Sequence, residues 1–218
     1  MRVPSLISLC LNRAAVAKVN WKGGALLAPV PAALVTCAHG GRSNVLTIAW
    51  TGIVNSKPPR CYISVRPERF SYELIQASRQ FVIHLAPRGL AAAVDFCGVK
   101  SGRDVDKFSA LHLSVEPSPV LGLPMLSQCP VAVECRVFEI IPLGSHDLFL
   151  ADIAGVCVDD AFISPSGKLR LDKADIIGFA HGSYYALGSY LGNLGFSVAK
   201  RPAGSKSKKD NNLRPNKN

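Results

Sequence analysis

The sequence has no apolar run of the roughly 18–20 residues that a helix needs to cross a bilayer. It is also low in charge, with 18% charged against 48% hydrophobic residues among its 218 positions. A chain of this composition can bury a core, which excludes global disorder. We therefore expect a soluble protein with no membrane partner, folded as one sizeable domain or two small ones.

No C-x-x-C motif occurs, and no pair of histidines has the spacing of zinc ligands, so we expect no metal site. Seven cysteines are spread along the chain, at positions 10, 37, 61, 97, 129, 135 and 157. An odd number without the spacing of a disulfide framework indicates reduced thiols and hence a cytoplasmic protein. Most of these cysteines are expected to be small apolar core residues.

The sequence also lacks a G-x-G-x-x-G motif, an internal repeat and an alternation of strands with helices. These absences argue against a Rossmann nucleotide site. Apolar, β-branched segments predict strands at residues 32–38, 45–54, 61–66, 81–85, 131–141 and 148–158. A Gly-rich stretch between the first two predicts a hairpin. Short helices are expected at 71–75, with Ser71 as N-cap, and at 90–96. The pattern is typical of a mostly β protein, an antiparallel barrel or sandwich.

The two ends of the chain differ from its middle. The first 17 residues contain two arginines and no acid, without a clean cleavage pattern. We interpret residues 1–18 as a loosely held N-terminal extension, or as the result of an over-early start codon. Residues 200–218 contain seven basic residues and one acid, and so carry six of the ten net positive charges. We expect a disordered tail there; binding to nucleic acid or to an acidic surface is the alternative, although no aromatic residues accompany the basic ones. Residues 19–199 form the predicted domain.

Five segments, taken in order, resemble the flavin-reductase-like, FMN-binding split-barrel family, and especially its flavoredoxin branch. They are LAPVP at 27–31, NVLTIAW at 44–50, KPP at 57–59 with SVRPERFS at 64–71, CGVKSGRDVDKF at 97–108, and GSHDLF at 144–149. Each segment alone is a weak signal, but their order and spacing together are specific. The resemblance implies an antiparallel Greek-key split β-barrel with a few short helices, FMN as cofactor, and a homodimer.

The resemblance implies that the flavin runs along residues 44–50. FMN brings a phosphate dianion, a ribityl chain and a ring edge that becomes anionic on reduction, so its site needs anion donors, small polar groups and a cation. The residues expected beside it are Asn44, Thr47, Ala49 and Trp50, with Cys97 touching it through its backbone. The alternatives are that Trp50 is ordinary core and that Asn44 is only a turn residue. A redox role for Cys97 would need a resolving cysteine, which the spacing does not show.

A phosphate site is predicted where a strand ends and a helix begins. Ser64, Val65 and Arg66 end the strand, and Arg69 and Ser71 open the helix. Free N–H groups at a helix start, a hydroxyl group and nearby arginines are typical of phosphate binding. The alternative is a plain capped helix with exposed arginines.

Two charged or titratable residues receive a catalytic role through the resemblance. Lys107 is expected to lie close to the flavin and to stabilise negative charge on the reduced ring. Its alternative is a weak surface pair with Asp104 or Asp106. His146 is expected to hydrogen-bond the ring or the phosphate, or to relay a proton, because its pKa lies near neutrality. Its alternative is a hydrogen bond to Asp147.

Phe179 is the last expected site residue, either shielding the flavin face or simply packing the barrel end. The implied activity is hydride transfer from NADH or NADPH to FMN, with electrons passing on to free flavin or to a redox protein. No ribose-2′ motif indicates which nicotinamide is used. Two other classes stay open: an FMN electron-transfer protein reduced by a protein donor, and a non-redox binding protein.

Overall fold

The computed structural model describes residues 18–198. The predicted tail, Cys10 and all but the last residue of the predicted extension lie outside the described residues. The chain divides after Ala186, and the fold below is that of the part up to this residue. Among the described helices, none combines the length and the apolar character that a membrane crossing requires.

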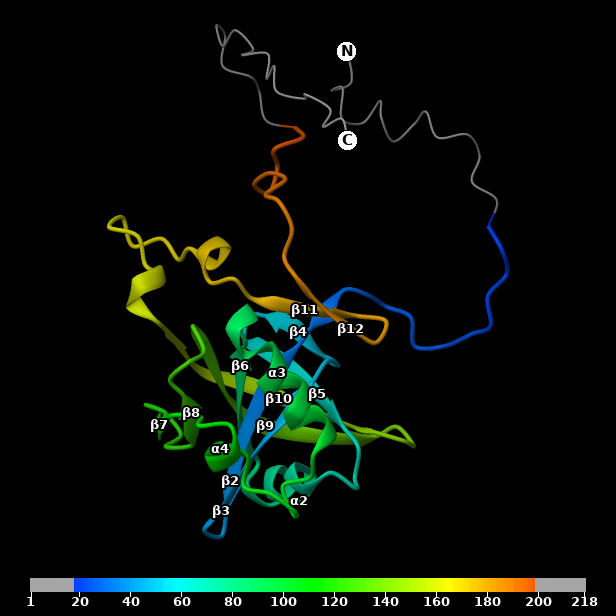
Figure 1. Ribbon diagram of the computed structural model, residues 1–218, viewed down its shortest axis with the longest axis vertical. Coiled ribbons are helices and arrows are strands. Elements are labelled where there is room, and N and C mark those ends of the chain that lie inside the picture. The colour runs from blue at the N-terminus through cyan, green and yellow to red at the C-terminus, as the bar shows by residue number, and fades with distance from the viewer. Residues whose placement is uncertain (1–17, 199–218) are drawn as a thin grey trace, which may run out of the picture. The chain divides into compact units, whose positions relative to one another are not determined.

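Within the described residues, the main feature is a seven-stranded sheet with the strand order β3-β2-β6-β9-β10-β5-β4 (Figure 1). Its strands are β2 Ala33–His39, β3 Arg42–Ile48, β4 Thr51–Ser56, β5 Pro59–Val65, β6 Gln80–Leu85, β9 Val131–Pro142 and β10 Asp147–Val158. Every neighbouring pair is antiparallel. The chain leaves β5 and re-enters the sheet at β6, with β9 and β10 between them, as in a Greek key. The predicted mostly β, antiparallel fold is confirmed.

The sheet curls so that its two edge strands approach each other at one corner of the barrel. The edge strands β3 and β4 follow each other in the chain and are joined by Ala49 and Trp50. The N–H group of Ser64 in β5 donates to the Trp50 carbonyl over 2.9 Å, which holds the corner in place. Alternate side chains of the strands point inward and form one core with α2. Because β3 and β4 share no ladder in the described part of the chain, the barrel is split along this corner.

The corner corrects one prediction from the sequence. Residues 45–54 were expected to form one strand, but β3 ends at Ile48 and β4 begins at Thr51. The segment contains no charged residue and no proline, so its local pattern does not mark the break. The bend arises because the two halves pair with different partners, β3 with β2 and β4 with β5.

The remaining elements cover the ends and outer face of the barrel. The helices are α2 Phe70–Ser78, α3 Ala91–Val99 and α4 Lys107–Ala110, with 3-10 turns η1 Arg88–Leu90, η2 Asp160–Phe162 and η3 Leu171–Lys173. The smaller sheets contain β1 Val30–Pro31, β11 Ile177–Ala180 and β12 Ser183–Ala186, and β7 Val115–Pro117 with β8 Pro124–Leu126. A second core joins α3 to the outer face of β2 through Leu34, Val94 and Cys97.

The cysteines behave as the sequence analysis expects. The six described cysteines are all free thiols, and five of them are buried. The exception is Cys157, which is partly exposed. Cys61 and Cys135 approach each other in the barrel core, with 3.4 Å between their Sγ atoms, as a thiol pair. These residues therefore serve packing rather than a disulfide framework.

Candidate functional site

Two adjoining cavities lie along β3, on the side where the barrel is split. The first, of about 240 Å³, is lined by Asn44, Leu46, Thr47, Glu68, Arg69, Phe70, Ser71, Cys97, Gly98, Lys100, Ser101, Gly102 and Lys107. The second, of about 220 Å³, is lined by Leu46, Thr47, Ile48, Ala49, Trp50, Ser64, Val65, Arg66, Arg69, His146 and Phe179. They share Leu46, Thr47 and Arg69, and together they reach the roughly 300–1,000 Å³ typical of small-molecule sites.

The structure brings every residue of the predicted site to one of these two cavities. The first cavity receives Asn44, Ser71, Cys97 and Lys107, and the second receives Ala49, Trp50, Ser64, Val65, Arg66, His146 and Phe179, with Thr47 and Arg69 lining both. The residues come from segments up to 135 positions apart in the chain, between Asn44 and Phe179. Their convergence is what a shared ligand would require, and their roles toward that ligand remain a proposal.

The polar end of the first cavity is built at the start of α2. Ser71 does not cap the helix as predicted: the N-cap is Arg69, and no side chain caps the helix there. The helix starts earlier because the Arg69 carbonyl already accepts a hydrogen bond from the Tyr72 N–H, over 2.9 Å. Ser71 Oγ instead accepts a hydrogen bond of 2.8 Å from Asn44 Nδ2, with both residues buried. This bond ties the edge strand β3 to the positive end of the α2 dipole.

Gly102 closes the wall of the first cavity next to Asn44. A Cβ atom at this position would lie 2.3 Å from Asn44 Oδ1 and 2.7 Å from Phe70 Cδ1. Any other residue would therefore push the Asn44 amide out of place, so the cavity wall requires glycine. Sequence reasoning missed Gly102, as it did Leu46 and Gly98; the only available signal was its place within the segment that resembles the family.

Lys107 is the buried cation of the site. Its side chain is 3% exposed, and Nζ donates to the carbonyl groups of Val45 and Cys97, each over 2.9 Å. Burial lowers the pKa of Lys107. The expected alternative, a surface pair with a neighbouring carboxylate, is wrong, because Asp106 accepts instead from the N–H groups that follow it and caps α4. A lysine held on two neutral carbonyl groups has its third N–H left for an anion.

His146 and Trp50 form the aromatic end of the second cavity. Their ring centroids lie 4.6 Å apart. Burial and the positive charge of Arg66 lower the pKa of His146. The expected alternative bond to Asp147 is not formed: His146 Nδ1 lies 3.0 Å from Ser145 Oγ, and the Asp147 carboxylate accepts from the Tyr72 hydroxyl group. The imidazole ring, with its pKa lowered, lines the second cavity.

The two arginines of the predicted phosphate site differ in their partners. Arg66 pairs with Glu68 over 3.3 Å, and both side chains are more than half exposed, so the pair contributes little. Arg69 has no carboxylate within ion-pair distance among the described residues, and it lines both cavities. Of the two, Arg69 is the better placed to meet an anion.

Cys97 contributes to the site through its backbone carbonyl group and not through its thiol group. Burial raises the pKa of the Cys97 thiol to about 11, against the opposing effect of Lys107. Such a group is not a thiolate at neutral pH and is a poor redox nucleophile. Its carbonyl group, by contrast, fixes Lys107.

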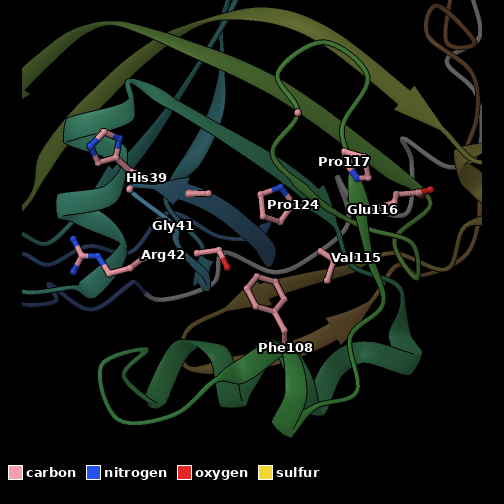
Figure 2. A pocket seen from close by; sticks show the side chains of 12 residues that line it. His39, Gly41, Arg42, Phe108, Val115, Glu116, Pro117 and Pro124 are labelled. Atoms are coloured by element: carbon pink, nitrogen blue, oxygen red, sulfur yellow. The ribbon is translucent and has the colours of Figure 1, made fainter.

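A larger hollow of about 590 Å³ lies elsewhere, between the β2–β3 hairpin, α4 and the β7–β8 ribbon (Figure 2). It contains none of the predicted site residues. Figure 2 shows His39 and Arg42 on one side of this hollow and Glu116 on the other, so its charged groups do not converge. A binding site needs a few polar groups aimed at one ligand, which the paired cavities have and this hollow does not.

Comparisons with known proteins agree with the geometry. A family model described as "Flavin reductase like domain" matches residues 26–187. The structure resembles the flavoredoxin of Desulfovibrio vulgaris (Miyazaki F), with a TM-score of 0.76 and 29% identity, over 81% of this chain and 97% of that one. It also resembles the flavoredoxin of Methanosarcina acetivorans, with a TM-score of 0.76 and 25% identity, over 84% of this chain and all of that one.

Two curated relatives match over shorter stretches. An uncharacterized protein of Aeropyrum pernix is 30% identical over 138 residues, which is 63% of this chain and 52% of that protein. An NADPH-flavin oxidoreductase of Streptomyces viridifaciens is 28% identical over 127 residues, 57% of this chain and 64% of that protein. The chain thus spans about half the length of the first relative and under two thirds of the second.

Proposed function

The chain belongs to the flavin reductase like family of FMN-binding oxidoreductases, and from this premise we propose that it holds FMN across the two cavities and takes hydride from NADH or NADPH. The observation that carries the proposal is the convergence of all thirteen predicted residues on two adjoining cavities with a buried cation. The chemistry that bound FMN supplies is acceptance of a hydride and release of electrons to free flavin or a redox protein.

The donors of the first cavity fit a phosphate-bearing ligand. Arg69, the start of α2 and the Asn44–Ser71 pair offer a guanidinium group, helix N–H groups and a hydroxyl group. The constraint on Gly102 keeps that wall free of any side chain. We propose that Arg69, Ser71 and Asn44 bind the phosphate, with Arg66 as a weaker partner.

Lys107 and His146 supply the electrostatics. The Lys107 ammonium group is fixed by Val45 and Cys97, so it places positive charge in the cavity without needing to reorganise. His146, whose pKa is lowered by burial and by Arg66, is proposed to hydrogen-bond the ligand or to carry a proton at a ring nitrogen. Trp50 and Phe179 bring aromatic surfaces to the second cavity, where they are proposed to pack against the ring of the flavin.

The experiment that tests this function is a visible spectrum of the purified protein with added FMN, before and after anaerobic addition of NADH or NADPH. We expect a perturbed flavin band that bleaches with one nicotinamide. Absence of any bound flavin band would contradict the function and leave the fold standing.

The same experiment separates a second candidate function, an FMN electron-transfer protein reduced by a protein donor. The likeness to two flavoredoxins at 25–29% identity is the observation that favours it. A bound band that bleaches with dithionite but not with either nicotinamide would support this candidate over a reductase.

Replacing Arg69 with alanine is expected to weaken FMN binding by about tenfold or more, because a charge-assisted hydrogen bond to the phosphate is lost. Riboflavin, which has no phosphate, should bind the variant about as well as the wild type. Fluorescence titrations with both flavins give the comparison, with Arg136→Ala as an exposed control of the same charge change. Equal losses for the two flavins would place Arg69 away from the phosphate.

We also propose a homodimer that involves the edge of β4 that no other described strand pairs with. Ile53 and Val54 on this strand are 69% and 50% exposed, and the strand leads directly from the Trp50 corner of the second cavity. An unpaired edge that exposes large apolar side chains is a typical interaction surface. Sedimentation of a single monomeric species at tens of micromolar protein would refute this assembly.

A further inference from the structure

Phe179 is positioned in the second cavity by a small hairpin that does not belong to the main sheet. The hairpin consists of β11 and β12, and β11 also pairs with β1. Its turn has His181 and Gly182 at φ 47° and 86°, the two left-handed residues of a tight type I′ connection. A tight turn fixes the two strands to each other, so whatever holds β12 also holds Phe179.

Tyr184 lies directly across the hairpin from Phe179. The two residues are register partners, and their rings meet edge to face with centroids 5.4 Å apart. The Tyr184 hydroxyl group reaches over to α3 and donates to Asp95 Oδ1 over 3.2 Å. Figure 1 shows the hairpin beside α3. Among the described residues, this is the one hydrogen bond that the β12 strand makes outside β11.

The same turn of α3 also fixes two other cavity side chains. The Val94 carbonyl accepts from Thr47 Oγ1, and the Cys97 carbonyl accepts from Lys107 Nζ. Asp95 lies between these two residues in the sequence. Tyr184 packs against Phe179 and bonds to Asp95. The position of Phe179 is therefore tied to the same short helix that positions Thr47 and Lys107.

We infer that Tyr184 is a positioning residue, which holds Phe179 over the second cavity through its hydrogen bond to Asp95 and so limits access to the flavin. This inference rests on the proposed function, since it concerns the residue that would cover the flavin face. Phe179 must yield when a nicotinamide stacks there, and the Tyr184–Asp95 bond opposes that movement. The bond thus sets a balance between shielding the site and admitting the hydride donor.

The test uses the FMN-loaded full chain and the variant Tyr184→Phe, which keeps the ring and removes only the hydroxyl group. The first readout is the rate of flavin bleaching by dithionite, a small reductant whose rate reports access to the flavin. We expect this rate to rise about threefold to tenfold, the span that corresponds to loss of one hydrogen bond. The KM for the nicotinamide should fall by a similar factor, with the FMN Kd unchanged.

Two matched variants identify the hydrogen bond as the cause. Tyr185→Phe removes the hydroxyl group of the neighbouring, more exposed tyrosine and should behave as the wild type. Asp95→Asn keeps an oxygen acceptor and should also stay close to the wild type, whereas Asp95→Ala should match Tyr184→Phe.

A double-mutant cycle decides whether Tyr184 acts through Phe179. Phe179→Ala should raise the dithionite rate at least as much as Tyr184→Phe, and the double variant should show no further increase. If Tyr184→Phe still has its full effect without the Phe179 ring, or if it equals the wild type in both readouts, the inference is overturned while the proposed function stands. A wild-type protein that binds no FMN would overturn both. The dithionite readout remains valid even if no nicotinamide reduces the protein.

Discussion

Replacing Lys107 with methionine is expected to weaken FMN binding by about tenfold to a hundredfold, the range for loss of a charge-assisted hydrogen bond to an anionic ligand. Methionine has nearly the same length and fills the same space, so the cavity wall is retained. The expectation follows from the burial of the ammonium group and its two backbone partners, Val45 and Cys97. Isothermal titration of the flavin-free protein with FMN measures the effect.

The same substitution should also make the bound flavin harder to reduce. Reduction places negative charge on the flavin, so loss of a nearby fixed cation costs the reduced form more than the oxidised form. For a two-electron couple, each tenfold loss of preference for the reduced form lowers the potential by about 30 mV. A redox titration against a dye of known potential gives this value.

Lys168→Met is the control, because it removes the same charge from an exposed lysine outside both cavities. Lys107→Met also has opposing effects on folding stability, since it removes a buried charge but leaves the two carbonyl groups that Lys107 binds without a donor. Thermal unfolding without FMN separates such effects from ligand binding. If the FMN affinity and the flavin reduction potential of Lys107→Met both match those of Lys168→Met, Lys107 does not belong to the flavin site.

Burial of Lys107 shows where prediction from the sequence reaches its limit. Four of the eight residues in the segment SGRDVDKF are charged and one is glycine, so by composition alone it favours a solvated loop. Lys107 is buried because α4 packs against β3, a contact between residues more than sixty positions apart. The sequence pattern contains no trace of this contact, and the resemblance to a known family was the sole indication that Lys107 belongs to a site.

Local signals did predict the elements whose causes are local. The hairpin between β2 and β3 follows from Gly40 and Gly41, which occupy left-handed conformations at φ 58° and 75°. The break at Ala49 and Trp50 was not predictable, because it depends on which strands the two halves pair with. Ser71 was assigned to the wrong helix position for a related reason: its hydroxyl group bonds to Asn44, a residue that the fold brings to it.

Acidification is expected to destabilise the fold through one buried histidine, independently of the flavin site. His84 is fully buried on β6, where Nδ1 lies 3.2 Å from the Leu34 carbonyl and Nε2 accepts from the Leu126 N–H over 3.1 Å. These two bonds require the neutral ring with its proton on Nδ1. Burial lowers the pKa of His84 to about 4, against the smaller opposing effect of the Leu34 carbonyl.

The direction of the pH effect follows from this lowered pKa. In the unfolded chain the histidine titrates near 6.5, so between pH 6.5 and 4 the unfolded state binds a proton that the folded state does not. The contribution of His84 is fully present above pH 6.5 and is lost as the pH falls toward 4. Over that window the free energy of unfolding should decrease by about 3 kcal/mol, at up to about 1.4 kcal/mol for each pH unit.

Urea unfolding of the flavin-free protein between pH 7 and pH 4 measures this loss. His84→Gln should be less stable than the wild type at pH 7, because the buried Leu34 and Leu126 groups lose well-placed partners, but its stability should fall much less on acidification. His39→Gln, at an exposed position on β2, should keep the wild-type dependence. If the His84 variant and the wild type lose stability in parallel between pH 6.5 and 4.5, the acid sensitivity belongs to the carboxylates instead.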